Sequence, residues 1–192
     1  MLPLILTSIG LGVGLAMDAF SVSLANGLNE PCMRPRKMLT VAGVFALFQA
    51  AMPLIGWLLI HTVLQYFKTF QAFIPWIALA LLGYIGGKML YDGIKNDSEN
   101  VCGIGGLSFG AILVQGVATS IDALSVGFTI SEYTLIPALI CAAIIAIVTF
   151  AICFAGVVIG KKAGTRLSGK AGIFGGIILI LIGLEIFITS WF

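Results

Sequence analysis

Six long apolar stretches occupy most of this 192-residue chain and limit what it can fold into. Each is long enough for a helix to cross the hydrocarbon core of a bilayer, which takes about 20 residues. Only 9% of the residues are charged, whereas a soluble domain carries about 25%, so a soluble enzyme fold is excluded. The sequence predicts an all-α integral membrane protein with six transmembrane helices, at approximately 2–28, 38–60, 70–94, 105–130, 135–159 and 171–191.

The basic residues predict how these helices are oriented. The loops after the first, third and fifth stretches would lie on one side of the membrane. If Lys88 snorkels to that side, it holds nine of the ten Lys and Arg residues: Arg34, Arg36, Lys37, Lys88, Lys95, Lys161, Lys162, Arg166 and Lys170. Because cytoplasmic loops are enriched in Lys and Arg, we expect both termini outside the cell. The net charge of +2 is spread over several loops, so a basic patch for nucleic acid is absent.

A motif in the first apolar stretch recurs in the fourth. Residues 12–23 read GVGLAMDAFSVS, and residues 116–127 read GVATSIDALSVG. At this offset of 104 (116 − 12), six of the twelve positions are identical: Gly12/Gly116, Val13/Val117, Asp18/Asp122, Ala19/Ala123, Ser21/Ser125 and Val22/Val126. So many identities indicate an internal repeat.

Each repeat holds three predicted helices, and because three is odd, the second repeat enters the membrane from the opposite side. We expect repeat 1 at residues 1–94, a cytoplasmic linker at 95–104 and repeat 2 at 105–192. Inverted repeats of this kind are found in many secondary transporters, whose binding sites lie near the midplane where the repeats meet. The first and fourth helices would approach each other there.

Asp18 and Asp122 occupy equivalent positions of the repeat, deep inside apolar stretches. A charge at that depth is costly unless it is paired, hydrated or protonated, and such residues usually have a function. The sequence places no basic residue at similar depth to pair with either. The alternative is a protonated, structural Asp. We predict that both residues line a binding site at the midplane.

Further oxygen-bearing side chains accompany the two aspartates. We include in the predicted metal site the hydroxyl groups one helical turn away and two amides: Ser21 and Ser125 at i+3, Thr119 at i−3, Gln49 in the second helix, and Asn26 toward the cytoplasmic end of the first. Carboxylate, amide and hydroxyl oxygens suit hard divalent cations such as Mn²⁺, Mg²⁺ and Ca²⁺. The alternatives are hydrogen bonds of the hydroxyl groups to their own helices and an interhelical hydrogen bond of Gln49.

Glycine and proline near these positions allow two interpretations. Gly10, Gly12 and Gly14 precede Asp18 on alternate positions. They predict either local unwinding that frees backbone carbonyls as ligands or close packing of helices. Pro53 is expected to kink the second helix and free a carbonyl near Gln49.

The motifs MDAFSVSLANG at 17–27 and TSIDALSVG at 119–127 resemble the paired signature of the bacterial MntP-type manganese efflux pumps. FQAAMPLIGW at 48–57 and GYIGGKMLYDG at 83–93 are similar to that family's second and third helices. The resemblance covers nearly the whole chain and implies a six-helix inner-membrane exporter of Mn²⁺ whose intramembrane carboxylates are Asp18 and Asp122. Some members carry Glu at the position of Gln49, so the site here has one negative charge fewer.

These observations together predict a secondary active exporter of divalent cations, foremost Mn²⁺, coupled to proton entry. We expect no catalytic residues and no bound cofactor. The expected partners are the lipid bilayer and the transported divalent cation, with no obligatory protein partner. Association into a homo-oligomer stays open. Two alternatives remain: an exporter of another cation or small solute on the same fold, and a non-transporting membrane scaffold. An intramembrane aspartyl protease is disfavoured because the two Asp contexts are near copies and no GxGD motif precedes either.

Overall fold

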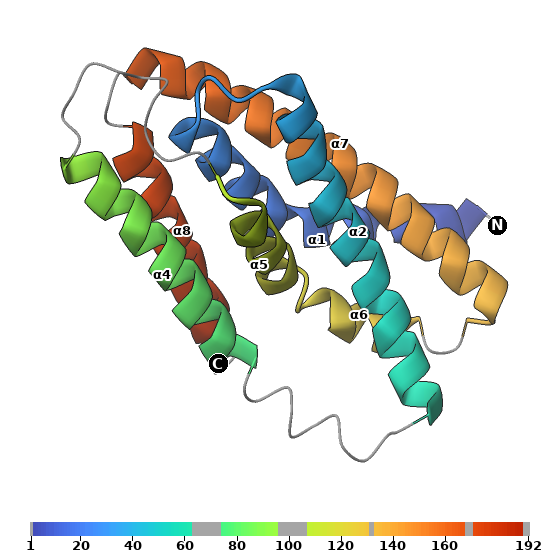
Figure 1. Cartoon of the computed structure of the whole chain (residues 1–192). Helices are drawn as coiled ribbons and strands as arrows, with labels where there is room; N and C mark the ends of the chain where they lie inside the picture. Colours follow the sequence, from blue (N-terminus) through green and yellow to red (C-terminus); the bar gives the residue numbers. More distant parts are fainter. Residues whose placement is uncertain (1, 63–73, 96–106, 131–132, 168–170, 190–192) are drawn as a thin grey trace.

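The protein is entirely helical over the residues that the computed structural model describes, which are 2–62, 74–95, 107–130, 133–167 and 171–189 (Figure 1). Its elements are α1 (Leu2–Asn29), α2 (Pro35–Thr62), α4 (Ile74–Lys95), α5 (Phe109–Thr119), α6 (Ala123–Thr129), α7 (Leu135–Leu167) and α8 (Ala171–Thr189). Three helices contain segments long and apolar enough to cross a membrane: Leu2–Asn29, Pro35–Leu59 and Leu135–Gly164. Shorter apolar segments lie at Phe109–Thr119 and Ile173–Ile182. The chain is therefore a multi-pass membrane protein.

The helices follow the predicted apolar stretches, with two corrections. The fourth stretch is not one continuous helix, because α5 ends at Thr119 and α6 begins at Ala123. The fifth helix continues to Leu167, beyond the end predicted at 159. A tertiary hydrogen bond stabilises this extension, because Lys161 Nζ donates to the carbonyl oxygen of Met33 at 3.0 Å. The beginning of the third stretch and residues 96–104 of the predicted linker lie outside the described residues.

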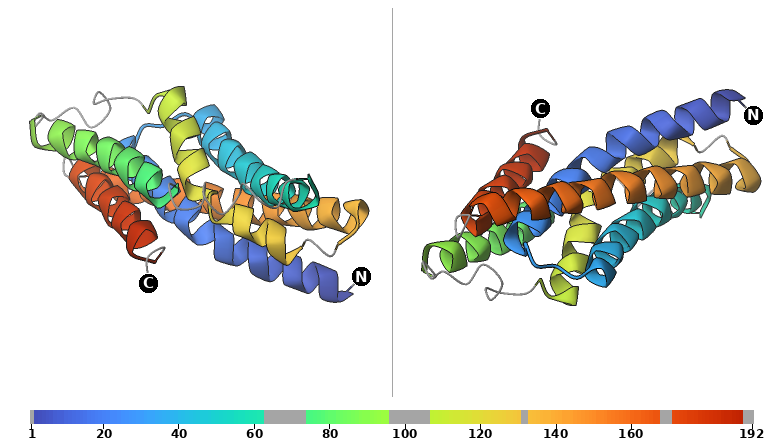
Figure 2. Two further views of the ribbon diagram at one scale, coloured as in Figure 1. Left: turned by 90° about the horizontal axis from the view of Figure 1, so that it is seen from below. Right: turned by 90° about the horizontal axis from the view of Figure 1, so that it is seen from above.

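Helices from the first half of the chain pack mainly on helices from the second half. The helix α1 lies along α7, α2 packs on both α7 and α6, and α4 packs on α8. Figure 2 shows the α1–α7 and α4–α8 pairs side by side in two further views. In the α1–α7 contact, the first predicted helix of the first half packs on the second predicted helix of the second half. In the α2–α6 contact, the second predicted helix of the first half packs on part of the first predicted helix of the second half.

The α1–α7, α2–α6 and α4–α8 contacts each contain a glycine from both helices. A Cβ on Gly160 of α7 would overlap the carbonyl oxygen of Leu24 in α1, and one on Gly127 of α6 would come within 2.6 Å of the backbone of Gly56 in α2. In the third contact, a Cβ on Gly176 of α8 would come within 2.6 Å of the carbonyl oxygen of Gly86. Small residues let membrane helices approach this closely, so their backbones make the contact.

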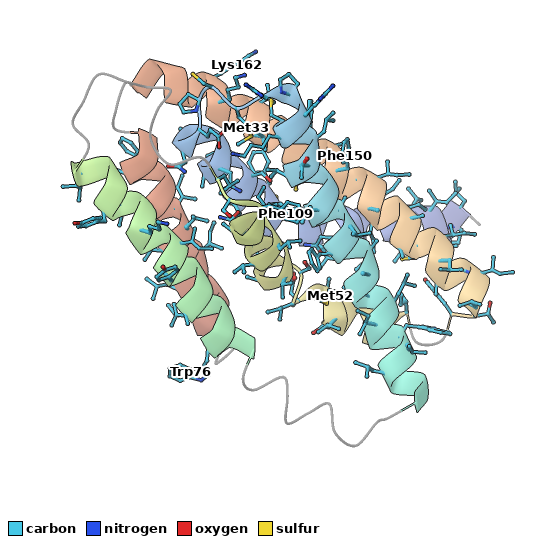
Figure 3. The ribbon with its side chains drawn as sticks, in the orientation of Figure 1. Met33, Met52, Trp76, Phe109, Phe150 and Lys162 are labelled. Carbon is cyan, nitrogen blue, oxygen red and sulfur yellow. The ribbon has the colours of Figure 1, made fainter. Side chains whose placement is uncertain are left out.

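Apolar side chains also cover the outside of the bundle. Leu6 of α1, Leu47 of α2, Trp76 of α4 and Ile147 of α7 are all more than half exposed. Trp76 points away from the bundle in Figure 3, whereas Met52 packs on a cluster that contains Ala123 and Val126 of α6. An apolar exterior around a packed interior is what a lipid environment requires.

The helix α1 is continuous through Gly10, Gly12 and Gly14, so the first helix does not unwind there. Gly12 is buried and a Cβ there would lie 3.2 Å from the side chain of Val148, which is the packing role. Pro53 likewise lies inside the uninterrupted helix α2. Proline has no N–H, so the carbonyl of Gln49, four residues earlier, lacks its usual helical donor.

Candidate functional site

The interruption of the fourth predicted span lies next to Asp122. Residues 120–122 form a turn between α5 and α6. Two side chains compete with backbone N–H groups for the last carbonyls of α5. Thr119 Oγ1 donates to the Gln115 carbonyl oxygen at 2.9 Å, and Ser120 Oγ donates to that of Gly116. Such bonds back to the preceding turn weaken and bend helices. The local sequence thus favours an end of the helix at this point.

Asp122 lies at the beginning of α6 and is exposed. Its Oδ1 atom accepts a hydrogen bond of 2.9 Å from the backbone N–H of Ala123. Asp18, half-buried on α1, is near enough for its carboxylate to interact electrostatically with that of Asp122. The fold therefore brings together the two acidic residues that the repeat singled out. A cation between them would relieve their mutual repulsion.

Gln49 on α2 reaches both Asp-bearing segments. Its Nε2 atom donates to the carbonyl oxygen of Leu15 in α1 at 2.9 Å and to that of Thr119 at the end of α5 at 3.0 Å. The side chain is fully buried, and its Oε1 atom has no hydrogen-bond partner. Because both N–H groups meet carbonyls, the amide cannot turn over, and Oε1 is presented as an unused acceptor.

The three predicted hydroxyl ligands lie in different surroundings. Ser21 Oγ donates to the carbonyl oxygen of Met17 at 3.1 Å, and Thr119 Oγ1 donates within α5. These are the bonds to their own helices that the sequence left as an alternative. Each hydroxyl oxygen still has lone pairs free to bind a cation, because it only donates its hydrogen. Ser125 is exposed on α6, one turn after Asp122.

Asn26 is joined to a residue outside the predicted metal site. Its Nδ2 atom donates to Oε1 of Gln115 at 2.7 Å, and Gln115 Nε2 donates back to Asn26 Oδ1 at 3.2 Å. Both residues are completely buried. Gln115 stands out in the sequence as an amide in an apolar stretch, but only the fold could identify its partner 89 residues away.

Two buried hydroxyl groups also lie in the interior: Thr149 Oγ1 on α7 has no hydrogen-bond partner, whereas Ser23 on α1 interacts with the thiol of Cys153. Nothing in their sequence surroundings distinguishes them from the serines and threonines that bond to their own helices. Among the described residues, no group of three or more His, Cys, Asp and Glu side chains could hold a metal ion. The acidic part of the candidate site is thus the Asp18–Asp122 pair, with neutral oxygens around it.

Comparison with known proteins identifies relatives over nearly the whole chain. The family model described as putative manganese efflux pump matches residues 32–187. The putative manganese efflux pump MntP of Ruminiclostridium cellulolyticum is 41% identical over 182 residues, covering 95% of this chain and 94% of the relative. A protein of the same name from Clostridium perfringens is 40% identical over 204 residues, covering 95% and 93%. One from the Loch Maree strain of Clostridium botulinum is 41% identical over 189 residues. No solved structure matches.

Proposed function

We propose that this chain, which belongs to the family of putative manganese efflux pumps, is a secondary active exporter that carries Mn²⁺ out of the cytoplasm. The proposal rests on the bridge that Gln49 makes between the two halves. Its Nε2 atom donates to the carbonyls of Leu15 and Thr119, which occupy equivalent repeat positions three residues before Asp18 and Asp122. Two carboxylates balance the charge of one divalent cation. Neutral oxygens around them complete a ligand set typical of hard metal ions.

We place the chain in the bacterial inner membrane as two inverted three-helix repeats, 1–94 and 105–192, joined by a cytoplasmic linker at 95–104. The distribution of Lys and Arg supports an orientation with both termini outside. The reciprocal helix contacts support the inverted relationship. Gly56 lets α2 pack on α6, and Gly160, at the same repeat position, lets α7 pack on α1.

Within this arrangement the cation binds between α1 and the turn that separates α5 from α6. Asp18 and Asp122 supply the charged ligands, and Gln49 Oε1 supplies a buried acceptor that the rest of the fold leaves unused. The hydroxyl oxygens of Ser21, Ser125 and Thr119 complete the set as the two halves move. Non-helical backbone inside a membrane protein is tolerated where it lines such a site.

Proton entry is the proposed driving force. Two carboxylates left close together without a cation repel each other, so protons replace the metal ion in the empty site. Protons arriving from outside would displace Mn²⁺, and Mn²⁺ from the cytoplasm would displace protons. An inside-negative potential opposes the outward movement of each positive charge by about 2.3 kcal/mol per 100 mV. Exchange of one Mn²⁺ for two protons carries no net charge and avoids that opposition.

The test is the metal content of an exporter-deficient bacterium under manganese load, determined by elemental analysis. The cells receive the intact protein, Asp122→Asn or Asp97→Asn at equal expression. Asp97, in the predicted linker, is the control for the same chemical change away from the site. We expect the intact protein and Asp97→Asn to lower cellular manganese and Asp122→Asn to have no effect.

Other outcomes would favour the remaining alternatives. If another metal falls while manganese stays constant, the chain exports a different cation through the same fold. If Asp122→Asn lowers manganese as well as the intact protein does, the paired-Asp site is wrong. If no metal changes with any variant, the scaffold interpretation replaces transport.

A further inference from the structure

The reciprocal amide pair of Asn26 and Gln115 links α1 to α5 in the membrane interior. Its two hydrogen bonds, of 2.7 and 3.2 Å, join neutral groups in a closed ring. Both side chains are completely inaccessible. A bulky polar pair in a helix contact of this kind has to be explained, because small and apolar residues would pack there without any need for partners.

The pair lies on one side of both aspartates. Asn26 follows Asp18 by eight residues, about 12 Å along α1. Gln115 precedes the turn at Asp122. The two helices are also tied together at this end, because Glu30, just beyond α1, accepts a hydrogen bond of 3.0 Å from the backbone N–H of Leu107, just before α5. The pair therefore stands between the aspartates and the end of the molecule that carries Glu30.

That end is the one with the basic residues. Lys37 at the beginning of α2 forms an ion pair with Glu30, and Lys161 of α7 binds the backbone of Met33. Met33 and Lys162 are both found at this end of the molecule in Figure 3. With the orientation proposed above, it is the cytoplasmic end.

Burial along α1 changes between the two sides of Asp18. From Val22 to Leu28, every residue but Leu24 is buried, whereas from Leu2 to Gly14 only Ser8 and Gly12 are buried. Asp122 and Ser125 are exposed as well. A carboxylate facing lipid would be highly unfavourable, so the exposed side of Asp122 faces water. On the cytoplasmic side, the buried Asn26–Gln115 pair joins α1 to α5, which leaves the outer side for access to Asp122.

We propose that Asn26 and Gln115 form the cytoplasmic gate of the transport path and, when separated, supply the first oxygen ligands that the cation meets. This inference rests on the proposed export function and on its orientation. The structure then represents the protein open to the outside, with its cytoplasmic gate closed.

The chemistry of the two amides suits this role. Each offers an oxygen that binds a hard cation and an N–H group that binds the partner amide. A divalent cation draws both oxygens toward itself, and this movement breaks the mutual hydrogen bonds. Arrival of the ion and opening of the gate are thereby coupled. Neutral bonds are weaker than bonds between charged groups, so the gate can open in each transport cycle.

The experiment locks the pair chemically and reverses the lock. Asn26→Cys and Gln115→Cys are combined in a chain whose four native cysteines are replaced by alanine. A short bis-methanethiosulfonate joins the new thiols across the distance that two amide side chains span, and dithiothreitol releases it. Uptake of Mn²⁺ is measured in inverted membrane vesicles. We expect cross-linking to lower Mn²⁺ uptake by about tenfold or more, and reduction to restore uptake in the same protein. Chains with only one of the two cysteines should not respond.

The outcomes separate the gate from the export function. If the cross-linked protein transports as fast as the reduced protein, the gate is wrong. If neither the intact protein nor the reduced variant transports Mn²⁺, the proposed function is wrong and the gate fails with it. If only the double variant is inactive, labelling of the single Gln115→Cys variant in the vesicles decides. If the new thiol of this Gln115→Cys variant reacts faster with a thiol reagent when Mn²⁺ is present, the gate is supported. If the thiol reacts equally slowly with and without Mn²⁺, the gate is wrong.

Discussion

The side-chain nitrogen of Gln49 lies 3.0 Å from the carbonyl oxygen of Thr119, at the residue where α5 ends. In an unbroken helix that carbonyl would accept the backbone N–H of Ala123, four residues later. The amide from α2 takes the place of this missing donor. Because the same nitrogen also binds Leu15 of α1, Gln49 fixes the spacing between the two segments that carry Asp18 and Asp122.

Replacing Gln49 by Glu should make export strongly dependent on protonation. A carboxylate would set an oxygen against the carbonyls of both Leu15 and Thr119, and only the protonated form can donate one of the two bonds. We expect Gln49→Glu to lower Mn²⁺ uptake at pH 7 by about tenfold or more, which corresponds to about 1.4 kcal/mol. Its rate relative to the intact protein should rise as the pH falls from 8 to 5.5. A ratio that stays constant over this range would contradict the role given to the amide nitrogen.

The two aspartates should act as one unit. If a single cation needs both carboxylates, Asp18→Asn and Asp122→Asn each abolish the same binding event, and the double variant loses little more. We expect Mn²⁺ uptake in inverted vesicles to fall to background in both single variants and in the double variant. Independent contributions, with losses that multiply, would show that the two residues serve different steps. The Asp97→Asn variant controls for expression and insertion.

Gly160 should not tolerate even one added methyl group. A Cβ there would overlap the carbonyl oxygen of Leu24 and lie 3.0 Å from the backbone nitrogen of Leu28, so α1 and α7 would have to separate. We expect Gly160→Ala to destabilise the folded protein by about 1–3 kcal/mol, the usual effect of overpacking. Thermal unfolding of the purified protein in detergent measures this effect.

Gly43 on α2 provides the matched control, because nothing lies within 4 Å of a Cβ at that position. There the change to alanine removes only the flexibility of glycine and should stabilise the helix by about 0.5–1 kcal/mol. Equal melting temperatures for Gly43→Ala and Gly160→Ala would mean that the α1–α7 contact is looser than the structure indicates.

Access to the site should differ between the two faces of the membrane. Ser125 is exposed and Thr119 is 1% exposed. In a chain without native cysteines, we expect Ser125→Cys to react with a membrane-impermeant thiol reagent applied to intact cells. Thr119→Cys should react far more slowly under the same conditions. Faster reaction of Ser125→Cys in inverted vesicles than in cells would reverse the proposed orientation or the proposed open side.

The apolar pattern of the sequence predicted the helices well, because a span must satisfy its own backbone in lipid and be apolar over about 20 residues. The ends of α1 and α8 differ from the predicted ends by at most two residues. The end of α7 was missed by eight, since a helix can continue into water whenever other contacts support it, as those of Lys161 do. The composition of a segment does not predict such tertiary contacts.

The two repeat motifs look alike, yet α1 is continuous and the fourth span is broken. Thr119 and Ser120 stand where the first repeat has Leu15 and Ala16, and only the hydroxyl side chains can take carbonyls from their own helix. That part of the difference is written in the sequence. The break is stabilised by Gln49, which is distant in sequence and donates to the Thr119 carbonyl that the break leaves without a helical donor.

By itself, then, the sequence determined the membrane location, the helical class, the repeat and the two acidic residues, because each of these follows from local composition and spacing. Only the tertiary structure decided which polar groups bind one another. It joined Asn26 to Gln115 and left Gln49 Oε1 without a partner. A buried amide must find a partner among all groups that packing brings within about 3 Å. That choice depends on helix contacts between distant segments, which no local pattern contains.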